Sequence, residues 1–460
     1  MNAVLVVIDS LRACSLGCNQ PGAPRTPFLD RLAGETITFR AARATECWTL
    51  PTHMSMFTGL LPSAHGAHFQ TMAYERSAPT IAELLASAGH RTEVVTRNSI
   101  FDGTLPGATR GFGTNTKLLA DLRTAHLFGL FVALSKPRIR RLIRTSGFFH
   151  VLQRENRDFL TTLARMIVPA DRRVLGYALD TMAALRRQGA PYFLFLNLYD
   201  VHAPYAPTAD SPLRPFRTLD GCIENLMLPW VATRLGSHAY LRPGFRFRPR
   251  TRRALLARYH RAIELMDAKL GEFYDAARGA RLLDDTLLVI ASDHGEAFGE
   301  HALWFHDASV YDTHLRVPLW IHHPERAPEV VDDVVSTAAV FTLLRNVALG
   351  QGLCGTLLDA DARAAIPVAL AEHFHYPHVP GALERYRHDV AAAVVGRRKA
   401  IVGPDGITCY DLVNDPDETS PEAGSIEGFA ATCRLDGAPA RAIAAATDHL
   451  RRWHATAAAA

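Results

Sequence analysis

The sequence lacks a regular cysteine framework. Its seven cysteines are an odd number scattered over 460 residues, and no CxxC pair is present. Disulfide-stapled secreted domains and the common zinc motifs have paired or closely spaced cysteines, so this pattern argues against both classes. A chain of this kind fits a reducing compartment, and we expect a cytoplasmic protein.

The sequence also has little net charge and no long apolar run. Lys and Arg number 50 against 46 Asp and Glu, which leaves a formal charge of +4. This balance is too mild to predict a nucleic-acid partner. No apolar run has the length of a membrane span, and the apolar residues AVLVVI (3–8) stand where a signal peptide would have a basic segment. We therefore expect no stable membrane insertion, and the oligomeric state is left open.

What the chain does have is a hydrophobic content of 48%, enough for one large α/β domain and a smaller one. Three continuous apolar runs are typical of strands buried on both faces of a parallel sheet: 3–8, 192–198 and 286–291. Acids or histidines directly follow each run: Asp9, then Asp200 and His202, then Asp293 and His294. Because ligands bind at the carboxyl ends of parallel strands, we expect these side chains to converge on one site.

Thr49 is the candidate reactive hydroxyl. Pro51 and the later Gly59 indicate a short helix that begins just after Thr49. The unpaired N–H groups at a helix N-terminus favour an anionic tetrahedral group such as phosphate or sulfate. Two carboxylates, an imidazole and a hydroxyl form a ligand set for Zn²⁺, Mn²⁺, Ca²⁺ or Mg²⁺, and a bound cation lowers the pKa of the hydroxyl. The pattern predicts double displacement through a phosphothreonine.

Other elements are expected from local patterns. Helices are predicted over 26–33, 81–88 and 259–277, and further strands over 92–96, 317–321, 391–395 and 400–402. The basic stretch 136–144 is interpreted as a solvated helix face, with a lid or a membrane-surface contact as the alternative. Lys399 is interpreted as a solvated lysine.

Six ordered segments carry a family resemblance: AVLVVIDSLRACSLGC, TPFLDRLA, WTLPTHMSMFTGLLPSAHG, LYDVHAPY, LLVIASDHGEAFGEHALWFHDASVYDTHLRVPLWI and ITCYDLVNDPDET. Together they resemble the sulfatase branch of the alkaline phosphatase superfamily over nearly the whole chain. The resemblance implies an α/β sandwich with a mostly parallel central sheet, helices on both faces and a smaller C-terminal α+β subdomain. We expect a catalytic domain over 1–360, with a helical insertion at about 118–187 and a cap at about 211–253, and a C-terminal subdomain over 361–460.

The resemblance also implies roles for single residues. It makes Asp9, Asp293 and His294 metal ligands, and Thr49 both a ligand and the nucleophile. His202 would contact the transferred group or protonate the leaving oxygen. Further candidates with weaker support are His306 for the same contact, Asn98 as a pocket residue, and His301 as either a residue behind the site or a catalytic one. His53 is a candidate for which a purely structural role is the alternative.

Two departures from the family pattern shape the functional hypothesis. Sulfatases of this branch have Cys or Ser in a CxPSR motif, converted to formylglycine, whereas the aligned stretch here begins with Thr49. Threonine at this position resembles the phosphodiesterases, phosphonate-active members and phosphotransferases of the superfamily. Ser10 replaces a second aspartate, which favours one Mn²⁺ or Zn²⁺ over Ca²⁺. A second metal bound by Asp200 and a histidine is the alternative.

We therefore predict a metal-dependent hydrolase of phosphate mono- or diesters, with phosphonate esters included, acting on a small anionic substrate. The alternatives are a phosphotransferase in which an alcohol replaces water, a sulfatase, and a member that binds an anion without turnover.

Overall fold

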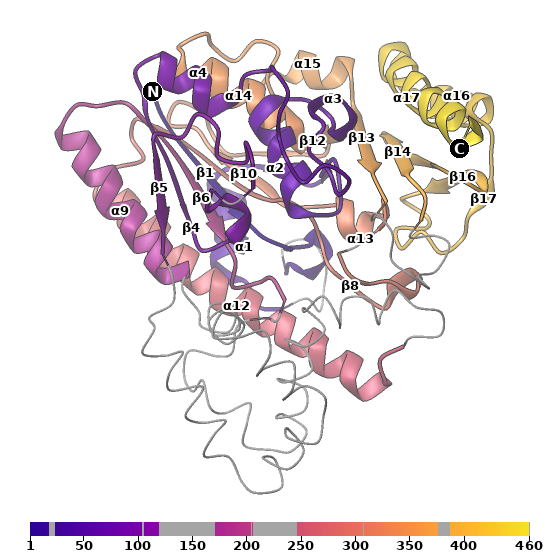
Figure 1. Cartoon of the computed structure of the whole chain (residues 1–460), viewed down its shortest axis with the longest axis horizontal. Helices are drawn as coiled ribbons and strands as arrows, with labels where there is room; N and C mark the ends of the chain where they lie inside the picture. Colours follow the sequence, from indigo (N-terminus) through magenta and orange to yellow (C-terminus); the bar gives the residue numbers. More distant parts are fainter. Residues whose placement is uncertain are drawn as a thin grey trace, which may run out of the picture.

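The computed structural model describes residues 1–17, 24–103, 105–118, 171–203, 205, 246–306, 308–375 and 387–459. An eight-stranded sheet forms its centre, with the order β11-β2-β10-β7-β1-β6-β4-β5 (Figure 1). The three middle strands are β7 (Thr286–Ser292), β1 (Asn2–Ile8) and β6 (Tyr192–Leu198), and every residue in them is buried. They run parallel to one another, whereas β10 (Leu319–His322) is antiparallel to both of its neighbours. The other strands are β11 (Glu329–Val331), β2 (Ile37–Phe39), β4 (Arg91–Thr96) and β5 (Thr114–Lys117).

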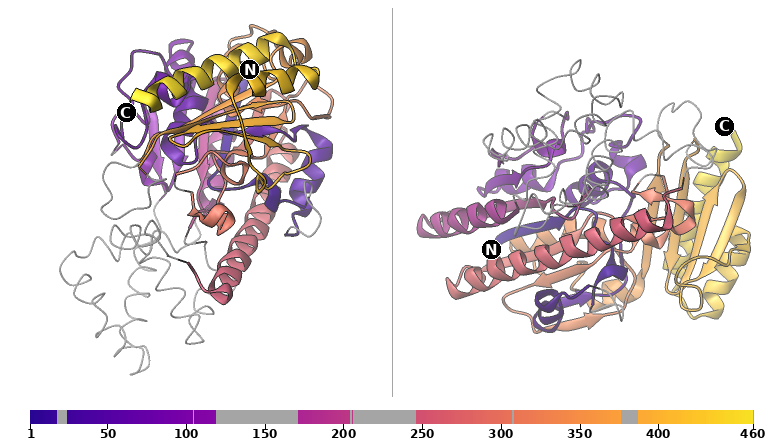
Figure 2. Two further views of the ribbon diagram at one scale, coloured as in Figure 1. Left: turned by 90° about the vertical axis from the view of Figure 1, so that its right-hand side faces the viewer. Right: turned by 90° about the horizontal axis from the view of Figure 1, so that it is seen from below.

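Helices cover both faces of this sheet. Alternate side chains of β1 enter two separate cores, because successive residues of a strand point to opposite faces. One core contains α1 (Pro27–Glu35), α9 (Asp171–Arg187) and α12 (Pro249–Gly279), and α9 and α12 lie side by side in Figure 2. The other contains α2 (Thr49–Thr58), α4 (Ile81–Ser87) and α14 (Val340–Ala348). Burial on both faces explains why the middle strands are mostly apolar.

A second, antiparallel sheet forms the C-terminal part. Its strands are β13 (Val368–His373), β14 (Val390–Val395), β15 (Arg398–Gly403), β16 (Gly406–Asp411) and β17 (Glu422–Ala423). The helices α16 (Ile426–Leu435) and α17 (Ala440–Ala459) pack on it, and α17 crosses the sheet in the left view of Figure 2. The predicted fold class, an α/β sandwich with a smaller C-terminal α+β part, is therefore confirmed.

Short elements complete the described chain: β3 (Ala42–Arg43), α3 (Pro62–His65), β8 (Ala297–Phe298), β9 (Trp304–Phe305), α13 (Asp312–Leu315), β12 (Val335–Ser336) and α15 (Ala360–Ala365). No helix in these described ranges is both long and apolar enough to cross a membrane.

The expected element boundaries differ most around α12. This helix begins at Pro249, ten positions before the predicted start, so the end of the expected cap (211–253) is helical. Its first turns contain four arginines and few regularly spaced apolar residues, so the apolar pattern did not predict that they are helical. The basic stretch 136–144, most of the expected insertion and the rest of the cap lie outside the described residues.

The prediction that Lys399 is solvated is wrong. Its side chain is fully buried, and its Nζ lies 2.8 Å from Oδ1 of Asp312 and 2.7 Å from Oε1 of Glu418. Arg43 pairs with the same Asp312 at 2.8 Å. These residues, which we call the interface cluster, join β3 and α13 to β15 and to the segment between β16 and β17.

Candidate active site

Asp9, Asp293 and His294 meet at the carboxyl ends of β1 and β7. Each offers one ligand atom, and the three atoms lie within 4.8 Å of one another. Nε2 of His294 is 3.3 Å from Oδ2 of Asp293 and 3.7 Å from Oδ1 of Asp9. All three side chains are fully buried. The structure thus brings together the acids and the histidine that follow the first and third apolar runs.

Thr49 completes this cluster from the other side. Its Oγ1 lies 3.5 Å from Oδ2 of Asp9 and 3.4 Å from Nε2 of His294. Thr49 is the first residue of α2, with Trp48 as the N-cap, so the helix begins one position earlier than expected. Every residue of α2 is buried, and the helix ends at Gly59 with φ of 73°, where an added Cβ would lie 2.9 Å from the Phe341 ring. The hydroxyl is therefore held on a fixed, enclosed helix end.

Ser10 fixes the two carboxylates. Its φ of 64° is in the left-handed region, which a serine rarely adopts. In this conformation its N–H donates to Oδ1 of Asp293 at 3.1 Å, and its hydroxyl donates to Oδ1 of Asp9 at 3.1 Å. The N–H of His294 also donates to Oδ1 of Asp293, at 2.9 Å. Ser10 thus acts as a donor to the carboxylates where the family pattern has an acid.

The electrostatics of the cluster fit a divalent cation. Burial, followed by the negative charge of Asp9, raises the pKa of Asp293 well above its usual value. The buried Oδ2 of Asp293 accepts no hydrogen bond from the described residues. Since buried carboxylates need a partner, this oxygen is chemically suited to bind a cation.

His294 is oriented for the same purpose. Its Nδ1 lies 2.9 Å from the carbonyl oxygen of Gly295, which can only accept, so Nδ1 carries the proton and Nε2 presents its lone pair to the cluster. Burial, and then the neighbouring His306, lower the pKa of His294 well below its usual value and keep the ring neutral. A neutral imidazole, two carboxylates and a hydroxyl suit Mn²⁺ or Zn²⁺, with Ca²⁺ a poorer fit because of the nitrogen.

His202 and His306 lie beside the cluster. The His306 ring is 4.5 Å from that of His294 and 4.8 Å from that of His202. Burial alone would lower the pKa of His306, but Glu296, 3.2 Å from its Nδ1, raises the pKa above the usual value. Burial lowers the pKa of His202. The pKa values of the two imidazoles are therefore shifted in opposite directions, and the shift at His306 favours the charged form.

Asn98 touches the cluster directly. Its side-chain oxygen accepts from the N–H of Ile100 at 3.0 Å, which caps the 3₁₀ turn Ser99–Phe101 after β4. Its Nδ2 donates to Oδ2 of Asp9 at 3.1 Å. His53, by contrast, lies beneath the helix end, with Nδ1 2.7 Å from the carbonyl oxygen of Thr49, and burial lowers its pKa to about 4.

Asp200 does not join the cluster, and its carboxylate has cationic partners where the alternative of a second metal needs a histidine. Its carboxylate pairs with Arg97 at 3.1 Å and with Lys269 at 2.5 Å. Sequence reasoning missed this pair of cations. Arg97 directly follows a predicted strand and could have been suspected, whereas Lys269 sits in the middle of α12 and carries no signal of its own.

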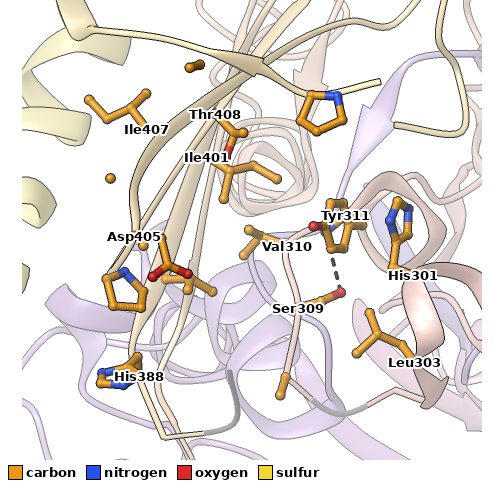
Figure 3. A pocket seen from close by; sticks show the side chains of 17 residues that line it. His301, Leu303, Ser309, Val310, Tyr311, His388, Ile401, Asp405, Ile407 and Thr408 are labelled. Carbon is orange, nitrogen blue, oxygen red and sulfur yellow. Dashed lines mark hydrogen bonds between the residues drawn. The ribbon is translucent and has the colours of Figure 1, made fainter. Parts of the chain in front are cut away.

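A cavity of about 750 Å³ lies between the segment 301–311 and the β15–β16 hairpin of the C-terminal sheet (Figure 3). Apolar side chains such as Leu303, Val310 and Ile401 line much of it. His301 also lines it, and its ring stacks on Tyr311 at 3.7 Å. The structure thus places His301 at this cavity, with its ring packed on a tyrosine.

Comparisons with known proteins agree on the family. The Sulfatase family model matches residues 1–348. Choline-sulfatase of Rhizobium meliloti (strain 1021) is 25% identical over 346 residues, which are 71% of this chain and 63% of that protein. Iduronate 2-sulfatase of Mus musculus is 23% identical over 355 residues, 71% of this chain and 60% of that protein. The chain thus matches somewhat less than two thirds of the length of these relatives.

Solved structures show the same fold. The phosphonate monoester hydrolase of Agrobacterium radiobacter superposes with a TM-score of 0.64 at 20% identity, and covers 98% of this chain and 96% of its own. The phosphonate monoester hydrolase from Silicibacter pomeroyi gives a TM-score of 0.62 at 19% identity, with 98% and 96% covered. With its family model matched over three quarters of its length, its parallel sheet and its acidic strand ends, the chain belongs to the sulfatase family, within the alkaline phosphatase superfamily.

Proposed function

We propose that this protein is a metal-dependent hydrolase of phosphate or phosphonate esters that uses Thr49 as its nucleophile. The observation that carries the proposal is the placement of the Thr49 hydroxyl, 3.4 Å from Nε2 of His294 and 3.5 Å from Asp9, at the buried start of α2. A small anionic ester is the substrate that a helix N-terminus and a cationic site would attract.

One divalent ion, Mn²⁺ or Zn²⁺ with Ca²⁺ as the alternative, is proposed to bind Asp9, Thr49, Asp293 and His294. When bound, such an ion lowers the pKa of a hydroxyl ligand and neutralises negative charge on the reacting group. The buried Oδ2 of Asp293, which accepts no hydrogen bond from the described part of the chain, supports this proposal.

The reaction is proposed to run as a double displacement on the threonine. The Thr49 hydroxyl gives its proton to solvent, and its Oγ1 attacks phosphorus. The Oγ1–P bond forms, and the bond from phosphorus to the leaving oxygen breaks with its electron pair staying on that oxygen. His202 or His306 contacts the transferred group and supplies the proton that the leaving oxygen needs; the raised pKa of His306 favours it as a positive contact. A water oxygen then attacks phosphorus, the Oγ1–P bond breaks, and a proton from that water returns to Oγ1, so that the phosphate or phosphonate product leaves and the Thr49 hydroxyl is restored.

Three alternatives differ in the acceptor, the substrate or the presence of turnover. In a phosphotransferase, an alcohol would replace water in the second step, with the same residues. The names of two relatives, Choline-sulfatase and Iduronate 2-sulfatase, support a sulfatase. This chain matches only part of the length of each, so the support concerns the shared part alone. A member that binds an anion without turnover fits less well, because the hydroxyl and the three candidate ligands all lie together.

The test is turnover of four p-nitrophenyl esters, namely the phosphate, the phenyl phosphonate, the bis-phosphate diester and the sulfate, by wild type and Thr49→Ala after metal reconstitution. We expect cleavage of a phosphate or phosphonate ester that requires the ion and disappears in Thr49→Ala. Sulfate as the sole substrate, or full activity in Thr49→Ala, would overturn the proposal. Turnover that appears only when a primary alcohol is added would establish the transferase.

A further inference from the structure

A second buried group of metal-ligating side chains lies outside the candidate active site. Glu46, Cys47 and His373 each offer a ligand atom, and these atoms lie within 4.8 Å of one another. All three side chains are buried, with at most 1% of any of them exposed. Glu46 and Cys47 belong to the turn before α2, whereas His373 ends β13 of the C-terminal sheet.

The three side chains converge on one point. Nδ1 of His373 lies 3.6 Å from Sγ of Cys47 and 2.9 Å from Oε1 of Glu46. A catalytic relay of cysteine, histidine and acid uses both ring nitrogens, one for each partner. Here the same nitrogen faces the thiol and the acid. The His373 ring therefore cannot pass a proton from one partner to the other, but the ligand atoms of the three side chains face the same point.

The distance between Cys47 and His373 suits a tetrahedral ion. With bonds of about 2.3 Å to sulfur and about 2.0 Å to nitrogen, tetrahedral Zn²⁺ holds the two ligand atoms roughly 3.5 Å apart. The Cys47 to His373 distance of 3.6 Å matches that value. Thiolate and imidazole ligands together select zinc over the harder Mg²⁺, Ca²⁺ and Mn²⁺.

The local charge also favours a cation. Oε2 of Glu46 is buried and accepts no hydrogen bond from the described residues. The neighbouring buried acid, Glu372, pairs with His449 at 3.7 Å, and Glu46 pairs with His373. Among the described residues, neither acid has a Lys or Arg partner, so this region buries two carboxylates with only histidines to balance them.

We propose that Glu46, Cys47 and His373 form a second, structural site for a divalent cation of the zinc type, distinct from the ion at Thr49. The site would tie the turn that leads into α2 to the C-terminal sheet. A backbone hydrogen bond already joins the two segments there, from the N–H of Glu372 to the carbonyl oxygen of Thr45 at 2.9 Å. The ion would therefore help to hold the start of α2, and with it Thr49, in position.

Cobalt absorption tests the proposal, because the cluster at Thr49 contains no sulfur. The purified full chain is stripped with a chelator and reconstituted with Co²⁺, and the thiolate-to-cobalt charge-transfer band is recorded. We expect the band in wild type and in Asp293→Asn, which disables the other cluster, and its loss in Cys47→Ala. The control is Cys433→Ala, which changes a buried cysteine in the core of the C-terminal part and should keep the band.

Metal content gives a second measurement. Elemental analysis after dialysis should find one zinc equivalent fewer in His373→Gln than in wild type. If wild type binds cobalt without a thiolate band, or if the band survives in Cys47→Ala, the site does not exist and the three residues form a hydrogen-bonded group only. The wild-type spectrum decides the question even where a variant fails to fold. Since it does not involve turnover, its result is independent of the hydrolase proposal.

Discussion

Asp293 and Asp312 are both buried aspartates, but their surroundings differ. At the candidate active site, the described ion-pair partners of Asp9 and Asp293 are histidines. At the interface cluster, Asp312 lies 2.8 Å from both Arg43 and Lys399. Burial would raise both pKa values, yet the two cations bring the pKa of Asp312 far below its usual value, whereas the pKa of Asp293 is raised well above it.

The difference separates a charge cluster that Arg and Lys side chains balance from one whose described partners are histidines. In the interface cluster two acids, Asp312 and Glu418, meet two bases within the chain, so the fold alone satisfies it. The candidate active site buries two acids with no Lys or Arg partner among the described residues, and a bound cation would balance their charge. Buried acids without Lys or Arg partners, such as those at the candidate active site, lower the stability of the protein alone but strengthen the binding of a cation. This arrangement is expected of a functional site.

The largest expected effect is a loss of turnover on substitution of Asp293, but not of Asp312. We expect Asp293→Asn to lower turnover by a factor of about 10³ or more, because a bound metal ion contributes several kcal/mol to the transition state and the variant weakens its site. Asp312→Asn, the matched variant, should retain turnover while it is folded. Steady-state rates on the p-nitrophenyl esters measure both.

For the stability of the fold we expect the reverse, with a smaller loss in Asp293→Asn than in Asp312→Asn. The metal-free Asp293→Asn protein should unfold at the same denaturant concentration as wild type or a higher one, because the variant removes a buried carboxyl group whose ionised form is disfavoured by burial and by Asp9. If Asp293→Asn unfolded far more easily than Asp312→Asn, the two clusters would not differ in the way described.

Lys399→Met tests the interface cluster. The substitution leaves Asp312 and Glu418 buried with Arg43 as the remaining base, and we expect a loss of about 3–5 kcal/mol in the free energy of unfolding, the usual cost of breaking a buried ion pair. Denaturant titration measures the loss. The neighbouring Arg397 is 41% exposed and pairs with Asp411 at 2.6 Å. Arg397→Met should cost about 1 kcal/mol or less, and a similar loss in both variants would contradict the prediction.

The same contrast explains what could be predicted from the sequence. Burial on both faces makes β1, β6 and β7 mostly apolar, so these strands and the acids after them can be recognised within a few residues of chain. The direction of β10 cannot be predicted in this way, because the sequence of a short apolar strand is the same whether the neighbouring strands run parallel or antiparallel to it. The middle of the sheet was therefore predictable, and the arrangement of its edge was not.

Lys399 and Asp200 show where the limit lies for side chains. The partners of Lys399 are Asp312 and Glu418, 87 and 19 positions away, and no local pattern indicates such contacts. Asp200 follows a buried strand as Asp9 does, yet Arg97 and Lys269 occupy its carboxylate. Position at a strand end predicts that an acid lies near the site; only the surrounding charges decide whether it can bind a metal.

A smaller effect is expected at Asn98, which donates to Asp9 at 3.1 Å without belonging to the candidate ligand set. Residues that hold a metal ligand through a hydrogen bond typically contribute a factor of 10–100 in affinity or activity, so we expect a loss of about that size in Asn98→Ala. Metal titration and kcat/KM measure it. Asn115→Ala, which removes a hydrogen bond to the carbonyl oxygen of Phe101 instead, should leave both unchanged. Equal losses in both variants would show a general effect on folding.

The smallest effect is a pH dependence of stability at the interface cluster. Although burial alone would raise the pKa of Asp312, Arg43 and Lys399 hold it far below the usual 3.8. A carboxyl group whose pKa is lower in the folded state stabilises the fold above its unfolded pKa, and this contribution is lost as the pH falls toward the folded pKa. The difference in unfolding free energy between wild type and Asp312→Asn should therefore shrink below about pH 4, by at most about 1.4 kcal/mol per pH unit.

Asp332→Asn, at a mostly exposed acid 3.5 Å from Arg40, should show no such change. A wild-type advantage over Asp312→Asn that stayed constant from pH 5 to pH 2 would mean that the cations do not hold Asp312 in its charged form, and the contrast with Asp293 would lose its electrostatic basis.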